Sequence, residues 1–165
     1  MTAVVPEFAA APRLANVLLA EDDPGDARLI RRAFDLNKLA LDLTWVEDGE
    51  AAMDHLLQEA SGKGGERTDL LLLDLNMPKM NGHEVLAAIR AEPRLTTLPV
   101  VILTTSRADE DVMESYRLRA NAYVPKPIDL EGLLKIVMTI QEFWFSIVVL
   151  PSEKPGLHGS ASGRR

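Results

Sequence analysis

An α/β fold built on a parallel sheet, with helices covering both of its faces, is predicted by two features of the sequence. The first is a regular alternation of short apolar runs with amphipathic helical stretches, five of each along the chain. The second is the run LLLL at residues 70–73, which is bounded by polar residues. Such a run suits a strand that is buried on both faces, as in the centre of a parallel sheet. Strands that alternate with helices also imply right-handed crossover connections.

The first two strand–helix units occupy the region before the four leucines. Residues 16–20, NVLLA, predict a buried first strand, and residues 26–36 carry apolar side chains at helical spacing. Residues 41–46, LDLTWV, alternate in the manner of a second strand, and Asp48 can cap a helix that extends to about Ala60.

The remaining units follow the loop SGKGGER. The four leucines form the third strand, and apolar residues within 85–89 mark the helix after it. Residues 98–104 predict the fourth strand, and a capping box that begins at Ser106 predicts the start of the next helix. Residues 121–124 predict the fifth strand, and Asp129 is placed to cap the last helix.

The composition is that of a single globular domain. The 165 residues carry a formal net charge of −7 with an isoelectric point near 5.0, which argues against a nucleic-acid-binding protein. The absence of cysteine excludes disulfides, thiolate metal sites and cysteine catalysis. We expect residues 1–14 to form a leader, 15–150 the domain, and 151–165 a disordered tail. The sequence shows no signal peptide and no membrane span, so a cytoplasmic location is expected.

Polar residues follow four of the five predicted strands, at the carboxyl end of each. They are Glu21, Asp22 and Asp23 after the first strand, Asp74 and Asn76 after the third, Thr104, Thr105 and Ser106 after the fourth, and Lys126 after the fifth. Carboxyl ends of parallel strands meet at one edge of a sheet, which is where open α/β sheets bind ligands. Each residue alone is readily explained as a turn, cap or surface residue. Their occurrence together at one edge predicts a site.

The chemistry of these residues favours phosphoryl transfer. Two carboxylates about 5 Å apart repel each other by roughly 3 kcal/mol at an effective dielectric near 20, so the acids need a proton or a cation. A hard divalent ion such as Mg²⁺ binds carboxylates together with phosphate oxygens. A hydroxyl and an ammonium can stabilise the other phosphoryl oxygens, and a carboxylate can accept the group as an aspartyl phosphate.

Four stretches of the chain together resemble the receiver domain of two-component response regulators. They are LLAEDDPGDARLIRRAF, DLLLLDLNMPKMNG, VVILTTS and AYVPKP. The resemblance covers residues 16 to about 140. It implies a flavodoxin-like, doubly wound sheet with five parallel strands in the order 2-1-3-4-5 and five helices.

The resemblance also implies roles for the acids. Asp74 would be the phosphoacceptor and would give a carboxylate oxygen to Mg²⁺. Asp22 would ligate the metal directly, Glu21 would act through a water, and Asn76 would supply its backbone carbonyl. Asp23 lies outside the usual acidic pair and is interpreted as a helix cap.

Further roles follow from the same resemblance. Thr104 matches the hydroxyl residue that moves toward the phosphoryl group, and Lys126 matches the lysine that pairs with it. Thr105 stands where the family has a small residue that leaves access to the phosphate. Tyr123 matches the switch aromatic, and the Lys126–Pro127 peptide bond would be cis.

The function implied is that of a stand-alone response regulator in a phosphorelay. The three histidines are scattered, so the phosphoryl donor would be a histidine of a partner sensor kinase. The protein would be a phosphoacceptor with slow self-dephosphorylation and no classical enzyme. The opening EDDPGDARLIRRAF, the motif LTTS and the ending FW…LP resemble small receivers paired with bacterial phytochrome kinases.

Two alternatives to this function remain open. One is a phosphohydrolase of the haloacid-dehalogenase type, which also forms an aspartyl phosphate. Such enzymes place a second aspartate two residues after the first, where this chain has Asn76. The other is a phosphate sink or relay that has no output of its own.

The C-terminal stretch predicts self-association. Residues 133–150 are rich in apolar side chains and divide into two sets at helical spacing. One set can cover the sheet: Leu133, Val137, Ile140 and Trp144. The second would face outward: Ile136, Phe143, Ile147 and Leu150. An outward apolar face favours a homodimer built on the last helix and residues 143–150, which could also extend as an arm.

Overall fold

The computed structural model describes residues 14–36 and 41–151. Its element order alternates strands and helices throughout. The first half comprises β1 (Ala15–Ala20), α1 (Pro24–Leu36), β2 (Leu41–Val46), α2 (Gly49–Ala60) and β3 (Leu70–Leu73). The second half comprises α3 (Gly82–Ala91), a 3₁₀ turn (Pro93–Leu95), β4 (Val100–Thr104), α4 (Asp109–Arg117), β5 (Ala122–Pro125), α5 (Leu130–Glu142) and a π-helical turn (Phe143–Ile147). The predicted leader and tail lie mostly outside the described residues.

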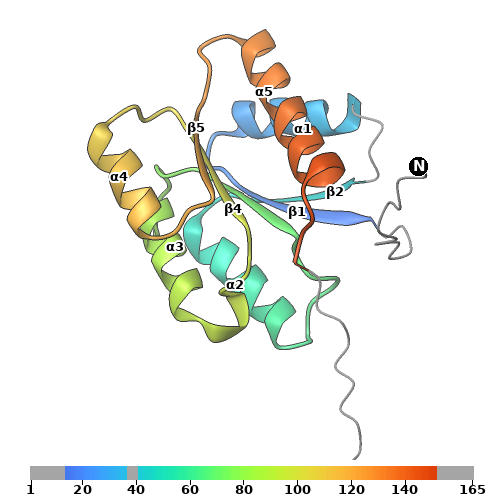
Figure 1. Cartoon of the computed structure of the whole chain (residues 1–165), viewed down its shortest axis with the longest axis vertical. Helices are drawn as coiled ribbons and strands as arrows, with labels where there is room; N and C mark the ends of the chain where they lie inside the picture. The colour runs from blue at the N-terminus through green and yellow to red at the C-terminus, as the bar shows by residue number, and fades with distance from the viewer. Residues whose placement is uncertain (1–13, 37–40, 152–165) are drawn as a thin grey trace, which may run out of the picture.

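The five strands form one parallel sheet in the order β2-β1-β3-β4-β5, which confirms the predicted doubly wound topology. Helices α1 and α5 cover one face, and α2, α3 and α4 cover the other (Figure 1). β3 lies at the centre of the sheet, with β1 and β4 as its neighbours. The residue that follows β3 is therefore carried to the middle of the carboxyl edge.

The four leucines of β3 are buried on both sides, as their sequence predicts. Leu71 and Leu73 belong to the core beneath α2 and α3, whereas Leu70 and Leu72 belong to the core beneath α1 and α5. All four side chains are fully buried. Full burial of a leucine contributes roughly 1.5–3 kcal/mol, so this strand anchors both layers.

Helix starts follow the predicted capping residues with one exception. Asp23 Oδ1 accepts hydrogen bonds from the backbone N–H groups of Gly25 and Asp26, at 2.7 and 3.1 Å, which confirms its role as a cap. The side chains of Asp48 and Asp129 cap α2 and α5. The capping box at Ser106 is wrong, because α4 begins after Ala108 without a side-chain cap.

The end of the chain differs from the predicted two-faced helix. Ile136 was expected to face outward, but it is half-buried against the α1–α5 core, together with Trp144 and Phe145. The reason is that α5 packs against α1 as well as against the sheet. The side chains that do reach solvent are Met138, Phe143, Ile147 and Val149. After the π-helical turn the backbone becomes extended at Val148.

Among the described residues, no helix is long and apolar enough to cross a membrane.

Candidate functional site

The predicted acids meet at the carboxyl edge of the sheet. Glu21, Asp22 and Asp74 each offer a carboxylate oxygen, and these oxygens all lie within 4.8 Å of one another. β1 and β3 are adjacent, and the backbone N–H of Asp74 donates to the carbonyl of Ala20 at 3.0 Å. The strand pairing therefore places the two acidic loops side by side.

The environments of the three acids differ. Glu21 and Asp74 are buried, with 1% and 6% of their surface exposed, whereas Asp22 is open to solvent. Trp45 lies on the neighbouring strand β2, and its indole N–H donates to the backbone carbonyl oxygen of Glu21 at 2.7 Å. One side of the cluster is thus walled off and the other side is accessible to an incoming group.

A lysine lies against the buried acids. Lys126 Nζ donates to Glu21 Oε2 at 2.6 Å, to Asp26 Oδ2 at 2.9 Å and to Asp74 Oδ2 at 3.1 Å. Its side chain is 4% exposed. Burial of a single ammonium is unfavourable, and the acidic partners are what make this one tolerable.

These contacts shift the protonation equilibria. Burial raises the pKa of the Glu21 carboxyl to about 7, and the nearby Asp74 carboxylate also raises it, while Lys126 opposes the shift. For Lys126, burial alone would lower the pKa. The hydrogen bond and charge of Glu21, together with Asp74 and Asp26, outweigh that effect and raise the pKa above its usual value.

Residues after β4 complete this edge of the sheet. Thr104 is fully buried at the end of β4, opposite Pro125 of β5. The backbone N–H of Lys126 donates to the Thr104 carbonyl at 2.7 Å, and Thr105 is exposed. The half-buried Tyr123 donates its hydroxyl hydrogen to the carbonyl of Ser106 at 2.9 Å.

The loop after β3 is held close to the acids by a glycine. Gly82 begins α3, and its N–H donates to the carbonyl of Leu75 at 2.9 Å. A Cβ at this position would overlap the carbonyl oxygen of Asp74 and lie 2.7 Å from the Cα of Leu75. Asn76 is exposed on the same loop, with its N–H 3.3 Å from Asp74 Oδ1. The loop therefore cannot accommodate a side chain at residue 82 without moving the candidate phosphoacceptor.

The prediction of a cis Lys126–Pro127 bond is not met, because no described peptide bond is cis. The trans form is the lower-energy state of such bonds by roughly 0.5–1 kcal/mol. In this conformation the carbonyl of Lys126 accepts a hydrogen bond from Arg107 at 3.1 Å.

The residue that the sequence reasoning missed is Asp26, the third acceptor of Lys126. It was read only as the start of a helix. Its position in the first turn of α1, at the same sheet edge as the other acids, is the signal that could have identified it.

The donor set fits a divalent cation. Carboxylate oxygens are the ligands that hard ions such as Mg²⁺ and Mn²⁺ take, and three of them converge here. Glu21, Asp22 and Asp74 are the residues that would hold the ion. Lys126 supplies one positive charge, which leaves the cluster with excess negative charge for a cation to offset.

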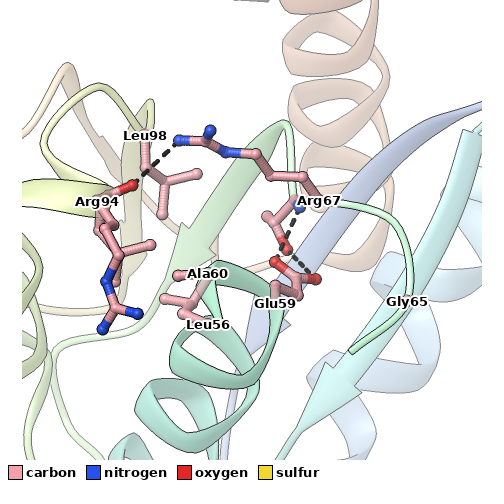
Figure 2. A pocket seen from close by; sticks show the side chains of 9 residues that line it. Leu56, Glu59, Ala60, Gly65, Arg67, Arg94 and Leu98 are labelled. Atoms are coloured by element: carbon pink, nitrogen blue, oxygen red, sulfur yellow. Dashed lines mark hydrogen bonds between the residues drawn. The ribbon is translucent and has the colours of Figure 1, made fainter. Parts of the chain in front are cut away.

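A separate pocket of about 300 Å³ opens at the opposite edge of the sheet, before β3 and β4 begin (Figure 2). Arg67 donates to the carbonyl of Arg94 at 3.2 Å, and Glu59 accepts from the hydroxyl and the N–H of Thr68, both at 2.9 Å. It contains none of the predicted site residues, because those follow the strands and these precede them. We assign it no part in the chemistry above.

Comparison with known proteins identifies the family of the chain. The family profile described as the response regulator receiver domain matches residues 17–138. The chain is 42% identical over 136 residues to response regulator Rcp1 of Synechocystis sp., which covers 82% of this chain and 92% of that protein.

Two solved structures show the same fold. A crystal structure of the phosphorylated cyanobacterial phytochrome response regulator RcpA matches with a TM-score of 0.80 and 42% identity, covering 85% of this chain and all of that one. A crystal structure of the Mn²⁺-bound form of Rcp1 matches with a TM-score of 0.78 and 41% identity, covering 84% of this chain and 99% of that one.

Proposed function

The chain belongs to the response regulator receiver domain family, and on that premise we propose that it accepts a phosphoryl group on Asp74 from a histidine of a sensor kinase. The observation that carries the proposal is the convergence of Glu21, Asp22, Asp74 and Lys126 at one edge of the sheet. Members of this family are in general phosphoacceptors and not classical enzymes.

The transfer exchanges one bond to phosphorus for another. An oxygen of the Asp74 carboxylate attacks the phosphorus of the donor phosphohistidine and forms a P–O bond. The P–N bond breaks, and its electron pair returns to the imidazole ring, which takes up a proton. Asp74 ends as an aspartyl phosphate, and the kinase histidine is released.

The residues of this chain prepare that step. Lys126 is held 3.1 Å from Asp74 Oδ2 and is placed to offset charge on the phosphoryl oxygens. A Mg²⁺ ion held by Asp22, Asp74 and the Asn76 carbonyl, and by Glu21 through a water, would supply further charge neutralisation when present. The openness of the Asp22 side leaves a direction from which a donor can approach.

The response to phosphorylation would run through β4 and β5. Thr104 would turn its hydroxyl toward the phosphoryl group, with Thr105 leaving room for it. Tyr123 would give up its hydrogen bond to Ser106 and turn inward, which changes the surface of α4 and β5. Such switching is a shift between two populated conformations.

We also propose that the kinase is a bacteriophytochrome. The support is the identity to Rcp1 and the structural match to a phytochrome response regulator, both over most of the chain. The alternative assignment as a phosphohydrolase is disfavoured by Asn76. Those enzymes need an aspartate two residues after the nucleophile to donate and accept a proton, and the asparagine side chain cannot do this.

Labelling with a small phosphoryl donor tests whether Asp74 is the phosphoacceptor. Incubate the protein with acetyl phosphate, with and without EDTA, and locate the label by mass spectrometry after trapping the acyl phosphate. Label should appear on Asp74, require the divalent ion, and vanish in Asp74→Asn. Asp54→Asn, an exposed aspartate on α2, is the matched control and should label normally. Label retained in Asp74→Asn would refute the assignment.

We further propose that the chain forms a homodimer through α5 and residues 143–150. Exposed Phe143 lines a groove of about 580 Å³ between the sheet-edge strand β5 and the end of α5, and Ile147 is exposed in the same π-helical turn as Phe143. A second copy of the same apolar segment is the simplest cover for this surface.

Sedimentation velocity at tens of micromolar tests the dimer. The wild type should sediment as a dimer, and Ile147→Asp should shift it toward the monomer. Met113→Asp changes an exposed apolar residue on α4 and should leave the dimer intact. A monomeric wild type, or a dimer that survives Ile147→Asp, would contradict this interface.

A further inference from the structure

The ammonium of Lys126 has no spare donor in the resting protein. A lysine ammonium carries three N–H donors and no acceptor. In this structure it meets three carboxylates, those of Glu21, Asp26 and Asp74, at 2.6, 2.9 and 3.1 Å. Any new acceptor, such as a phosphoryl oxygen on Asp74, must therefore replace one of these contacts or share it.

The three contacts are not equally easy to release. The side chains of Glu21 and Asp74 are 1% and 7% exposed, whereas that of Asp26 is 30% exposed. A buried carboxylate that loses its partner pays the full cost of an unpaired charge, but water can replace the lost partner of an exposed one.

Asp26 also has a second source of stabilisation. It lies in the first turn of α1, where the unpaired N–H groups of the helix favour a negative charge. Its own backbone N–H is already fixed by Asp23 at 3.1 Å. Asp26 therefore keeps other stabilising contacts when the lysine leaves it, because it is partly exposed to water and lies at the start of α1.

We propose that Asp26 is a positioning residue that holds Lys126 in the resting state, and that its bond to the ammonium is the one exchanged for a phosphoryl oxygen when Asp74 is phosphorylated. This inference rests on the proposed function, because it concerns the same site. Because the contact between Asp26 and Lys126 would exist in the resting state alone, it would shift the conformational equilibrium toward that state and away from the phosphorylated one.

Beryllofluoride provides the test, because it forms a tetrahedral phosphoryl-like adduct on a carboxylate without turnover. The indole N–H of Trp45 donates a hydrogen bond to the Glu21 carbonyl at 2.7 Å, so the fluorescence of this tryptophan can report on the nearby adduct. Titrate beryllofluoride at saturating Mg²⁺ into the wild type and Asp26→Asn. The affinity of the variant should be tighter by about threefold to tenfold, the range for loss of a competing, partly exposed ion pair.

Two controls separate the specific effect from a general one. Asp35→Asn removes the same charge from an exposed position of α1 and should leave the affinity unchanged. Loss of a nearby negative charge would by itself favour an anion, so the comparison is repeated in a Lys126→Met background. If Asp26 acts through Lys126, the gain disappears there; if it acts through its charge alone, the gain remains.

A structure of the beryllofluoride-bound wild type gives a readout that does not depend on any variant folding. Lys126 Nζ should contact a fluoride, and the Asp26 carboxylate should be turned to solvent. A persisting hydrogen bond between Asp26 and Nζ, an unchanged or weaker affinity in Asp26→Asn, or an equal gain without the lysine would each overturn the inference. Failure of the wild type to bind beryllofluoride at all would instead overturn the proposed function, and this inference with it.

Discussion

Replacing Lys126 with methionine should destabilise the fold strongly, and more so at high pH. Methionine keeps the length of the side chain but removes the charge. The substitution leaves Glu21 and Asp74, both buried, without the cation that each of them contacts. Removal of one partner from a buried ion pair typically costs about 3–5 kcal/mol.

The pH dependence follows from Glu21. Burial raises its pKa to about 7 even with the lysine present, so loss of the lysine raises it further. Below pH 6 the carboxyl can hold a proton and avoid an unpaired charge, but at pH 8 it must either ionise or keep a proton that the unfolded chain has lost. The difference in unfolding free energy between wild type and variant should therefore grow by roughly 1 kcal/mol from pH 6 to pH 8.

Urea denaturation at both pH values, in EDTA, measures this difference. Lys135→Met, at an exposed position of α5, is the matched control and should change stability by less than about 0.5 kcal/mol. Added Mg²⁺ should restore part of the loss in the Lys126 variant, since a bound cation replaces the missing charge. A Lys126→Met variant as stable as Lys135→Met, or a difference that does not change with pH, would refute this account of the buried acids.

Three further changes have definite expected outcomes. Gly82→Ala places a Cβ against the carbonyl of Asp74, so it should lower the free energy of unfolding, measured with urea, by about 1–3 kcal/mol and should slow labelling by acetyl phosphate. Gly65→Ala is the control, because the space around Gly65 is open, and it should change neither quantity. The pKa of Glu21 is raised from 4.5 to about 7, so the metal-free protein should lose stability as pH rises through that window, relative to Glu21→Gln, and its affinity for Mg²⁺ should increase over the same range. Gln141 is fully buried, and neither polar atom of its amide has a partner in the described structure, so Gln141→Met should raise the unfolding free energy by about 1–2 kcal/mol without affecting labelling.

Much of the fold could be predicted because its determinants are local. The second strand and the four-leucine strand have the predicted limits, since each apolar run is bounded by polar or turn residues. The fourth strand begins at Val100 instead of residue 98. Pro99 has no N–H to donate to the sheet, and only its carbonyl takes part, accepting from Leu71 at 3.0 Å.

The predictions that failed depend on contacts that residue spacing alone does not show. Helical spacing alone placed Ile136 outward, but the spacing cannot indicate that α1 packs beside α5 and covers it. Ser106 has the chemistry of a cap, yet in the folded chain its hydroxyl bonds to Asp111 at 2.5 Å and lies ahead of the helix start. For Ile136 the deciding neighbour, α1, is distant in the sequence, whereas for Ser106 it is Asp111, five residues along the chain.

The sequence predicted which residues meet at this edge of the sheet, but it did not predict all of the contacts among the charged groups there. Position at strand ends was enough to bring Glu21, Asp22, Asp74 and Lys126 to one edge, because parallel pairing aligns those ends. No strand rule includes Asp26, which reaches the ammonium from a helix.

On the proposed function, the placement of Asp74 at the end of a strand buried on both faces would prepare its carboxylate to accept a phosphoryl group. The leucines before it exclude water from its inner side, so its charge is balanced by fixed groups and not by solvent. The charges of these fixed groups do not cancel, because one buried ammonium contacts three carboxylates and the exposed carboxylate of Asp22 lies beside them. The excess negative charge would favour a divalent cation, and the ammonium would then stabilise a phosphoryl group added to Asp74. Because every donor of that ammonium is already engaged, a phosphoryl group on Asp74 would have to replace or share one of the resting contacts. The proposed phosphorylation of Asp74 would therefore be coupled to a rearrangement of the carboxylates around Lys126.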